Sequence, residues 1–226
     1  MVTQPKSVVL ADDQHLVRAG MRCLLHAETE FRVVGESGDG LRVTALVKRL
    51  KPSLVLLDVA LPGLWGLEVA RRVRQIAPAA GIVVLSRFPS PPYVVEALRN
   101  GANAFVAKQA NPAELARALR VAMSGGYYLS RPLSRIPLKR WLDRAKALPA
   151  TAYDTLTGRQ REILQLVAEG HSNLAISQRL GISVRTAEVH RARVLERLGV
   201  HSQADLIRYA LARGIIPPPE PMSRPN

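Results

Sequence analysis

Cysteine, aromatic residues and long apolar runs are all scarce in this chain of 226 residues. Cys23 is the only cysteine, which excludes an internal disulfide and a zinc site built from cysteines. Aromatic side chains make up 4% of the chain, so we expect cores built from aliphatic residues. No apolar run reaches the roughly 18 residues that a membrane-spanning helix needs. The first residues, M-V-T-Q-P-K, contain no apolar stretch, so we expect no signal peptide. We therefore expect a cytoplasmic protein with no membrane partner.

Positive charge is abundant by contrast. The 32 lysine and arginine residues outnumber the 18 acidic residues, and the net charge is +14. A net charge of +8 falls on residues 126–226 and +6 on the longer segment 1–125. A basic chain favours a polyanionic partner such as nucleic acid. Because many proteins are basic for other reasons, this composition becomes informative only beside a motif that fits nucleic acid.

Short apolar runs alternate with amphipathic stretches over residues 1–125. The apolar runs lie at 8–10, 32–35, 54–57, 82–85 and 104–107. Runs of this length and composition are typical of strands that are buried on both faces of a parallel sheet. Helical periodicity follows each run, at 15–25, 40–50, 66–76, 92–100 and 112–124. Five strand–helix units in series predict a doubly wound α/β domain with a five-stranded parallel sheet.

The pattern changes after residue 125. Residues 126–155 are rich in proline and arginine and are interpreted as a linker. Within the linker we expect one short amphipathic helix between Pro137 and Pro149, with Trp141 on its apolar side. The pattern of residues 156–216 is entirely helical, which predicts a small all-α domain. Residues 217–226 are rich in proline and are interpreted as a disordered tail.

Polar residues occur where four of the predicted strands end. Asp12 and Asp13 follow the first strand, Asp58 ends the third, Ser86 ends the fourth, and Lys108 follows the fifth. The carboxyl ends of parallel strands lie at one edge of the sheet, and binding and catalytic sites of such sheets are usually found at this edge. Three clustered carboxylates repel one another unless a cation joins them. Hard oxygen ligands favour Mg²⁺, which also accepts phosphate oxygens.

The last part of the chain carries helix-capping signals at regular intervals. Thr157 and Gln160 form a capping-box pattern that opens a helix ending at Gly170. Serines before residues 173 and 184 cap two further helices, and a turn at Gly181 separates them. A fourth helix is predicted over residues 203–213. Two short helices joined by a glycine-containing turn predict a helix-turn-helix.

The third of these helices, about 184–198, is the candidate recognition helix. Its apolar stripe of Ala187, Val194 and Leu198 should face the core. The residues expected to contact DNA are Arg185, Thr186, Glu188, Val189, Arg191, Ala192 and Arg193. The arginines are candidates for phosphate contacts, the glutamate can accept from cytosine N4, and the valine and alanine suit thymine methyl groups.

The acidic pattern closely resembles the receiver domain of response regulators. The matching stretches are V-V-L-A-D-D-Q-H-L-V-R-A-G, L-V-L-L-D-V-A-L-P-G-L-W-G-L-E, V-V-L-S and G-A-N-A-F-V-A-K. The resemblance implies a flavodoxin-like strand order 2-1-3-4-5, with Asp58 as the residue that takes a phosphoryl group from a sensor histidine kinase. It further implies a role for each matching residue. Asp13, Asp58 and the Ala60 carbonyl would bind the metal ion directly, and Asp12 would bind it through water. Lys108 would pair with the phosphoryl oxygens. Ser86 and Phe105 would move on phosphorylation.

The C-terminal segment is similar to LuxR-type helix-turn-helix domains. The match runs from L-T-G-R-Q-R-E to R-V-L-E-R-L-G-V, and T-A-E-V-H-R-A-R-V leans toward the FixJ-like branch. Both halves together resemble two-component response regulators of the NarL/FixJ type. This implies double-stranded DNA as the target, a homodimer on DNA, and RNA polymerase as a further partner. No enzymatic turnover is expected.

Four alternatives to this assignment remain, and particular residues argue against some of them. An aspartyl-nucleophile phosphatase would place a second aspartate two residues after Asp58, where this chain has Ala60. A dinucleotide-dependent oxidoreductase would need a glycine-rich turn at Ala11-Asp12-Asp13-Gln14. A regulator of the same fold that binds DNA without phosphorylation is disfavoured by the intact set of residues named above, from Asp12 to Lys108. Phe105 lacks the hydroxyl of the tyrosine usual at that position, and we expect Arg87 and the proline-rich loop 88–92 to change the phosphoryl lifetime or the dimerising face. A small helical interaction domain is the alternative for the C-terminal half.

Overall fold

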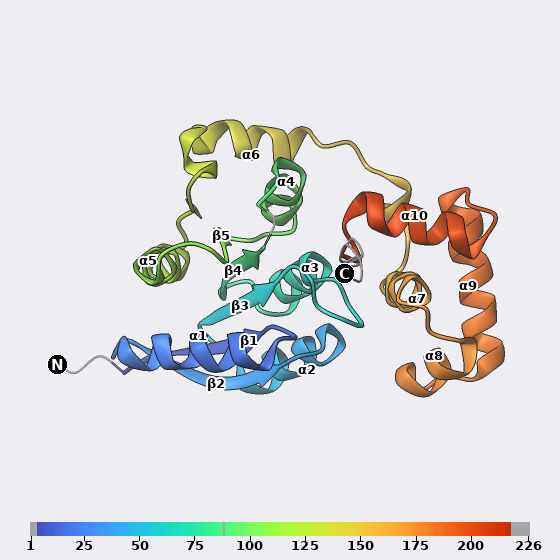
Figure 1. Cartoon of the computed structure of the whole chain (residues 1–226), viewed down its shortest axis with the longest axis horizontal. Coiled ribbons are helices and arrows are strands. Elements are labelled where there is room, and N and C mark those ends of the chain that lie inside the picture. The colour runs from blue at the N-terminus through green and yellow to red at the C-terminus, as the bar shows by residue number, and fades with distance from the viewer. Residues whose placement is uncertain (1–3, 88, 218–226) are drawn as a thin grey trace, which may run out of the picture. The chain divides into compact units, whose positions relative to one another are not determined.

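The computed structural model describes residues 4–87 and 89–217 of the chain. Contacts between residues divide the chain into two units, Met1–Pro149 and Ala150–Asn226 (Figure 1). The boundary at Pro149 places residues 126–149, which the sequence analysis assigned to a linker, in the first unit. The predicted tail, residues 217–226, lies outside the described residues except for Pro217.

The first unit begins with five strand–helix pairs, as predicted. The strands are β1 (Lys6–Ala11), β2 (Phe31–Ser37), β3 (Leu54–Asp58), β4 (Gly81–Ser86) and β5 (Ala104–Ala107). The helices are α1 (His15–Ala27), α2 (Gly40–Leu50), α3 (Gly66–Ile76), α4 (Pro91–Arg99) and α5 (Pro112–Met123). The strands pair in parallel in the order β2-β1-β3-β4-β5, which confirms the doubly wound α/β fold.

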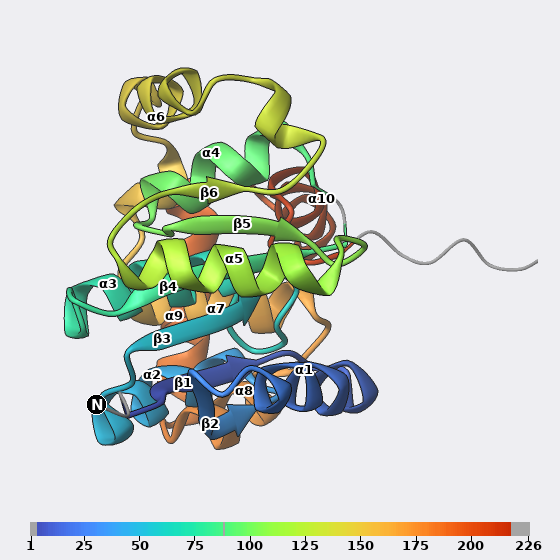
Figure 2. The same cartoon turned by 90° about the vertical axis from the view of Figure 1, so that its left-hand side faces the viewer.

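Helices cover both faces of this sheet. Because side chains alternate along a strand, one set of strand residues, including Leu10, Leu56 and Val106, packs on α1 and α5. Figure 2 shows these two helices in front of the sheet. Helices α2, α3 and α4 contact the same strands and lie on the opposite side in Figure 1. The alternate set, which includes Phe105, is therefore buried on the side of α2, α3 and α4.

A sixth strand, which the sequence analysis did not predict, extends the sheet beyond β5. It is β6 (Tyr128–Leu129), and it pairs in parallel with Ala104 and Phe105. Within the described residues the sheet therefore has six strands, where five were expected. A strand of two residues is too short to show any periodicity, so its pairing follows from the position of the β5 edge rather than from its own pattern.

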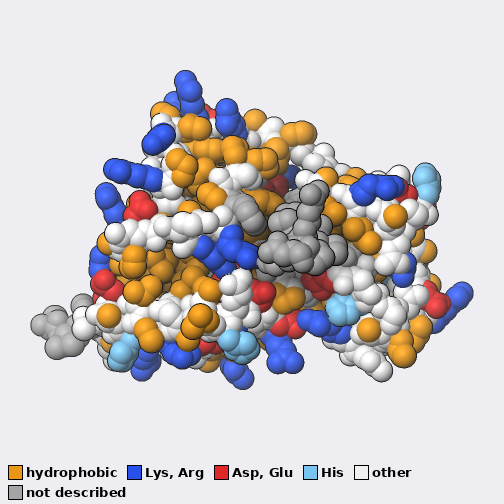
Figure 3. Space-filling view, in the orientation of Figure 1, with side chains coloured by type: hydrophobic (Ala, Val, Ile, Leu, Met, Phe, Trp, Pro, Cys, Tyr) orange, Lys and Arg blue, Asp and Glu red, His pale blue; other side chains and the backbone are white. Residues whose placement is uncertain are grey.

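The chain continues from β6 into a helical cover over α4. A 3-10 helix η1 (Leu133–Arg135) leads to α6 (Leu138–Ala147), the predicted amphipathic helix, which packs against α4. The Trp141 side chain is completely buried, and its Nε1 donates to the carbonyl oxygen of Leu133 at 3.3 Å. Basic side chains of α6 point outward, and Figure 3 shows lysine and arginine gathered on this part of the surface.

Residues 150–217, the described part of the second unit, form a short 3-10 helix and four α-helices. They are η2 (Ala152–Thr155), α7 (Gly158–Ala168), α8 (Asn173–Leu180), α9 (Val184–Leu198) and α10 (Gln203–Arg213). The capping box of Thr157 and Gln160 is formed, and Ser172 and Ser183 cap α8 and α9 as predicted. Gly181 ends α8 at a positive φ of 63°, which an L-residue rarely adopts. The predicted helix-turn-helix is thus present.

Among the described residues, no helix is both long enough and apolar enough to cross a membrane.

Burial of Trp141 predicts a large loss of stability on truncation. Trp141→Ala removes the indole that fills the space between α6 and the rest of the first unit, and such substitutions cost about 3–5 kcal/mol. Urea denaturation of the full-length variant, followed by circular dichroism, measures the change. Asp143→Ala, on the exposed side of the same helix, is the matched control and should change stability by less than about 0.5 kcal/mol. Equal stability of both variants would show that α6 contributes little.

Candidate functional site

Three aspartates meet at the carboxyl edge of the sheet in the first unit. Asp12 directly follows β1, Asp13 comes next, and Asp58 is the last residue of β3. One carboxylate oxygen from each lies within 4.8 Å of the other two. The Asp12 and Asp58 side chains are buried, whereas Asp13 is exposed. The structure therefore brings together the three acidic residues predicted from the sequence, with one of them open to solvent.

The Lys108 ammonium lies between the two buried carboxylates. Its Nζ donates to Asp12 Oδ2 at 2.6 Å and to Asp58 Oδ2 at 2.7 Å. These two hydrogen bonds join residues 96 and 50 positions apart in the sequence. A charged donor shared by two carboxylates offsets part of the cost of burying them together. The cluster of three aspartates and one lysine keeps two net negative charges.

Burial has the largest effect on the pKa of the Asp58 side chain. It raises the pKa of the Asp58 carboxyl above its usual value because the charged form loses its hydration. The Lys108 ammonium lowers the same pKa by charge and by its hydrogen bond, and the neighbouring Asp12 raises it. A hydrogen bond from the backbone of Ala60 also lowers it. The balance leaves a carboxyl group whose ionised form gains from any additional cation.

The remaining residues predicted for this site lie around the aspartates. Ser86 ends β4 and is buried, and its carbonyl oxygen accepts from the backbone N–H of Lys108 at 2.8 Å. Ala60 lies in the loop that follows Asp58. Phe105 is completely buried, in register with Val84 on one side and Leu129 on the other. All the residues predicted for the acidic site therefore belong to one edge of the sheet or to the strands that form it.

Arg18 supports the loop of Asp12 and Asp13, a role that is not evident from the sequence pattern. Its Nη1 donates to the carbonyl oxygens of Asp12 at 2.6 Å and of Asp13 at 3.1 Å, and the side chain is largely buried. An arginine on an amphipathic helix is ordinarily exposed, so its spacing on α1 does not distinguish it. Only the turn that follows β1 brings these carbonyl groups within its reach.

Gly66 allows the loop after Asp58 to return close to the strand. Its N–H donates to the carbonyl oxygen of Val59 at 3.0 Å. A Cβ atom at this position would lie 1.9 Å from the carbonyl oxygen of Asp58. Glycine is therefore required at the start of α3 for steric reasons, and the L-W-G-L-E stretch in the sequence contained this signal.

The candidate recognition helix α9 exposes one continuous face. Ala187 and Val194 are buried in the second unit as predicted, and Leu198 is half-buried. Of the residues predicted to contact DNA, those that are exposed are Arg185, Glu188, Val189, Ala192 and Arg193. They follow helical spacing, so they share a face. Thr186 is half-buried, and its hydroxyl shares a hydrogen bond with that of Ser183 at 2.8 Å.

Arg191 differs from the other predicted phosphate contacts. Its guanidinium donates to Asn173 Oδ1 at 3.3 Å and to Gln203 Oε1 at 2.8 Å. These residues are the first residues of α8 and α10. Arg191 therefore connects α9 to the start of two other helices, a contact that helical spacing alone could not show.

The raised pKa of Asp58 predicts a pH-dependent gain of stability on its removal. A carboxyl group with a raised folded pKa contributes stability that is present below its unfolded pKa and lost as pH rises through the folded pKa. In metal-free buffer, Asp58→Asn should therefore unfold at higher urea concentration than the wild type at pH 7, with Asp12 still available to Lys108. The difference should shrink as pH falls toward about 4, the usual range of aspartate.

Asp143→Asn, an exposed aspartate of α6, is the control and should leave the unfolding midpoint unchanged. A wild type that equals or exceeds Asp58→Asn in stability at pH 7 would contradict the burial cost of the ionised carboxylate.

Comparison with known proteins matches both units. The family model described as response regulator receiver domain matches residues 8–120, and that described as bacterial regulatory proteins, luxR family, matches residues 154–210. The uncharacterized transcriptional regulatory protein YxjL of Bacillus subtilis is 33% identical over 92% of this chain and 96% of its own length. The oxygen regulatory protein NreC of Staphylococcus aureus is 30% identical over 92% of this chain and 98% of its own length.

Solved structures that resemble this chain are also response regulators. A LuxR-family two-component response regulator from Aurantimonas sp. SI85-9A1 has a TM-score of 0.57 and 29% identity, and covers 60% of this chain and 97% of its own. The response regulator RcsB in complex with DNA has a TM-score of 0.54 and 25% identity, and covers 91% of this chain and 97% of its own. The chain therefore belongs to the two-component response regulators that join a receiver domain to a LuxR-type helix-turn-helix, and it is a DNA-binding transcriptional regulator.

Proposed function

We propose that Asp58 accepts a phosphoryl group from a sensor histidine kinase and that this modification controls DNA binding by the second unit. The observation that carries the proposal is the position of Asp58 beside Asp12, Asp13 and Lys108. A buried carboxylate with an ammonium group 2.7 Å away has a nucleophilic oxygen and a partner for incoming phosphoryl oxygens in one place. Phosphoryl transfer depends mainly on such positioning and charge neutralisation.

The donor set fits a magnesium ion. It offers three carboxylates whose oxygens lie within 4.8 Å of one another, and hard oxygen ligands are those that Mg²⁺ prefers. Asp13 and Asp58 would hold the ion directly together with the Ala60 carbonyl group, and Asp12 would act through water. The ion would neutralise the charge that the phosphoryl oxygens bring to an already negative site.

The protein residues would carry the transfer as follows. An Asp58 carboxylate oxygen forms a bond to phosphorus as the bond between phosphorus and the kinase histidine nitrogen breaks, and the nitrogen keeps the electron pair. The Lys108 ammonium then pairs with an oxygen of the transferred group. Ser86, buried at the end of β4, would donate its hydroxyl proton to another, and Phe105 would accompany its movement.

On the second unit, the exposed face of α9 is the proposed DNA contact. Arg185 and Arg193 would contact phosphates, while Glu188, Val189 and Ala192 would face base edges in the major groove. Arg191 and Thr186 would support the helix and its start, since their side chains already have partners within the unit. Glu188 would accept from cytosine N4 and would reduce non-specific affinity for the polyanion.

The proposal includes a homodimer on DNA, RNA polymerase as a further partner and the cytoplasm as the location. Its support here is the family to which the chain belongs, together with the basic charge of residues 126–226. A dimer would present two recognition helices to two half-sites, which would link phosphorylation to promoter binding.

Phosphorylation control can be tested with a non-transferable phosphoryl analogue. Wild type and Asp58→Asn are compared with and without beryllofluoride and Mg²⁺, for dimerisation by sedimentation and for DNA binding by fluorescence anisotropy. The wild type should change in both measurements when the two additives are present, and the variant should not. Identical behaviour in all four conditions would falsify phosphorylation control and favour a regulator that binds DNA without it.

Salt dependence tests the assignment of phosphate contacts. Arg193→Ala should weaken binding to specific and unrelated DNA about equally and lower the slope of log affinity against log salt concentration by about 1. Arg140→Ala, an exposed arginine of α6 in the first unit, is the charge-matched control and should leave the slope unchanged. The assignment fails if Arg193→Ala changes neither affinity nor slope, or if Arg140→Ala changes both equally.

A further inference from the structure

Ser130 connects the segment after the receiver domain to the strand that leads to Lys108. It lies ten residues beyond the matched receiver region 8–120, and it is completely buried. Its N–H donates to the carbonyl oxygen of Phe105 at 3.1 Å, and its Oγ accepts from the N–H of Ala107 at 2.9 Å. Phe105 and Ala107 both belong to β5, and Lys108 directly follows Ala107, the last residue of this strand.

The Ser130 hydroxyl takes the place of a backbone acceptor in the sheet. Parallel ladders alternate donors and acceptors along each strand, and the backbone of β6 supplies this pattern up to Ser130. There the Ser130 carbonyl oxygen accepts from Ser134 instead, at 3.3 Å, as the chain turns into η1. The side-chain oxygen extends the ladder by one further bond, to Ala107, at the end of β5.

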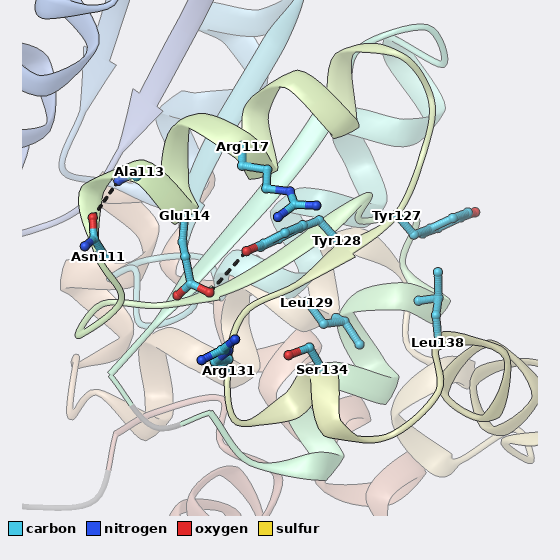
Figure 4. A pocket seen from close by; sticks show the side chains of 10 residues that line it. All are labelled: Asn111, Ala113, Glu114, Arg117, Tyr127, Tyr128, Leu129, Arg131, Ser134 and Leu138. Atoms are coloured by element: carbon cyan, nitrogen blue, oxygen red, sulfur yellow. Dashed lines mark hydrogen bonds between the residues drawn. The ribbon is translucent and has the colours of Figure 1, made fainter.

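Strand β6 is also held from the side of α5. The Tyr128 hydroxyl donates to Glu114 Oε1 at 3.2 Å, and the Arg117 guanidinium lies 5.9 Å from the centre of the Tyr128 ring. Figure 4 shows these side chains along an open pocket of about 770 Å³ between α5, β6 and η1. The neighbouring Leu129 is buried. Contacts on both sides therefore fix the position from which Ser130 reaches Ala107.

The position of Lys108 depends on the same end of β5. The Lys108 N–H donates to the Ser86 carbonyl oxygen on β4, and Ala107 is in register with Ser86. Ala107 is thus held by β4 on one side and by Ser130 on the other. From this anchor the Lys108 side chain reaches Asp12 and Asp58. Loss of one side of the anchor would let the strand end and its ammonium group shift.

We propose that Ser130 is a positioning residue for Lys108, so that the segment from β6 to α6 completes the phosphoacceptor site from outside the receiver domain. The inference deepens the proposed function and rests on it. Ser130 touches neither the aspartates nor the incoming group in this scheme, and it acts only through β5. Because coupling between two sites is reciprocal, a phosphoryl group on Asp58 would in turn stabilise the attachment of β6.

Ser130→Ala in the full-length protein separates this role from a general structural one. The rate of phosphorylation by a small phosphodonor with Mg²⁺ should fall about tenfold, since a small misplacement of a reacting partner has effects of this order or larger. The dissociation constant for Mg²⁺ alone should stay unchanged or decrease, because the ion depends on the aspartates and competes with Lys108 for them. Ser134→Ala, an exposed serine in the same segment, should match the wild type in both measurements.

Two results for Ser130→Ala would overturn the inference. One is an unchanged or increased phosphorylation rate. The other is a parallel loss of phosphorylation and Mg²⁺ affinity, which would indicate a loosened fold. Failure of the wild type itself to become phosphorylated would instead remove the proposed function, so the two failures are distinguishable.

Hydrogen exchange on unaltered protein tests the reciprocal effect and does not depend on folding of the Ser130 variant. Peptides that span residues 126–131 should exchange more slowly when beryllofluoride and Mg²⁺ are present. Asp58→Asn should show no such change under the same conditions. Unchanged exchange of this segment, in wild-type protein that binds beryllofluoride, would contradict the coupling of β6 to Asp58.

Discussion

The site in the first unit depends on one ammonium group shared by two buried carboxylates. Lys108 reaches both Asp12 and Asp58 from the end of β5 at under 3 Å. Without it, two buried acidic groups would face each other with little compensation for their lost hydration. With it, the cluster still keeps an excess of negative charge and one exposed carboxylate, Asp13. The same contact therefore permits the acidic cluster to fold and leaves it able to attract a cation.

The contacts of Lys108 with the two carboxylates also depend on residues that position the backbone and do not themselves belong to the acidic cluster. Arg18 holds the carbonyl groups of the acidic loop, and Gly66 lets the following loop pass close to Asp58. Ser130 anchors the end of β5 from the opposite side of the strand to β4. Each of these residues acts on backbone rather than on a carboxylate. Their common effect is to define where the strand ends lie.

The helix-turn-helix unit has a different source of order. Its helices begin at side-chain caps and end at glycines with positive φ, such as Gly181 and Gly199. Local signals of this kind specify helix length with little help from distant residues. Long-range contacts then set the angles between the helices, as in the bonds from Arg191 to Asn173 and Gln203. The exposed face of α9 results from both.

The secondary-structure elements and the residues at their ends could be predicted from the amino-acid sequence. Apolar runs predicted the first five strands, capping residues predicted the helices of the second unit, and the order of Asp12, Asp58 and Lys108 predicted the acidic edge. These signals are local, or follow from the rule that parallel strands end on one side. The pairing of β6 with β5 and the hydrogen bond between Ser130 and Ala107 could not be predicted in this way and are seen only in the folded chain. Such contacts depend on which strand edge, distant in the sequence, a short segment packs against. The periodicity of a short segment does not contain this information.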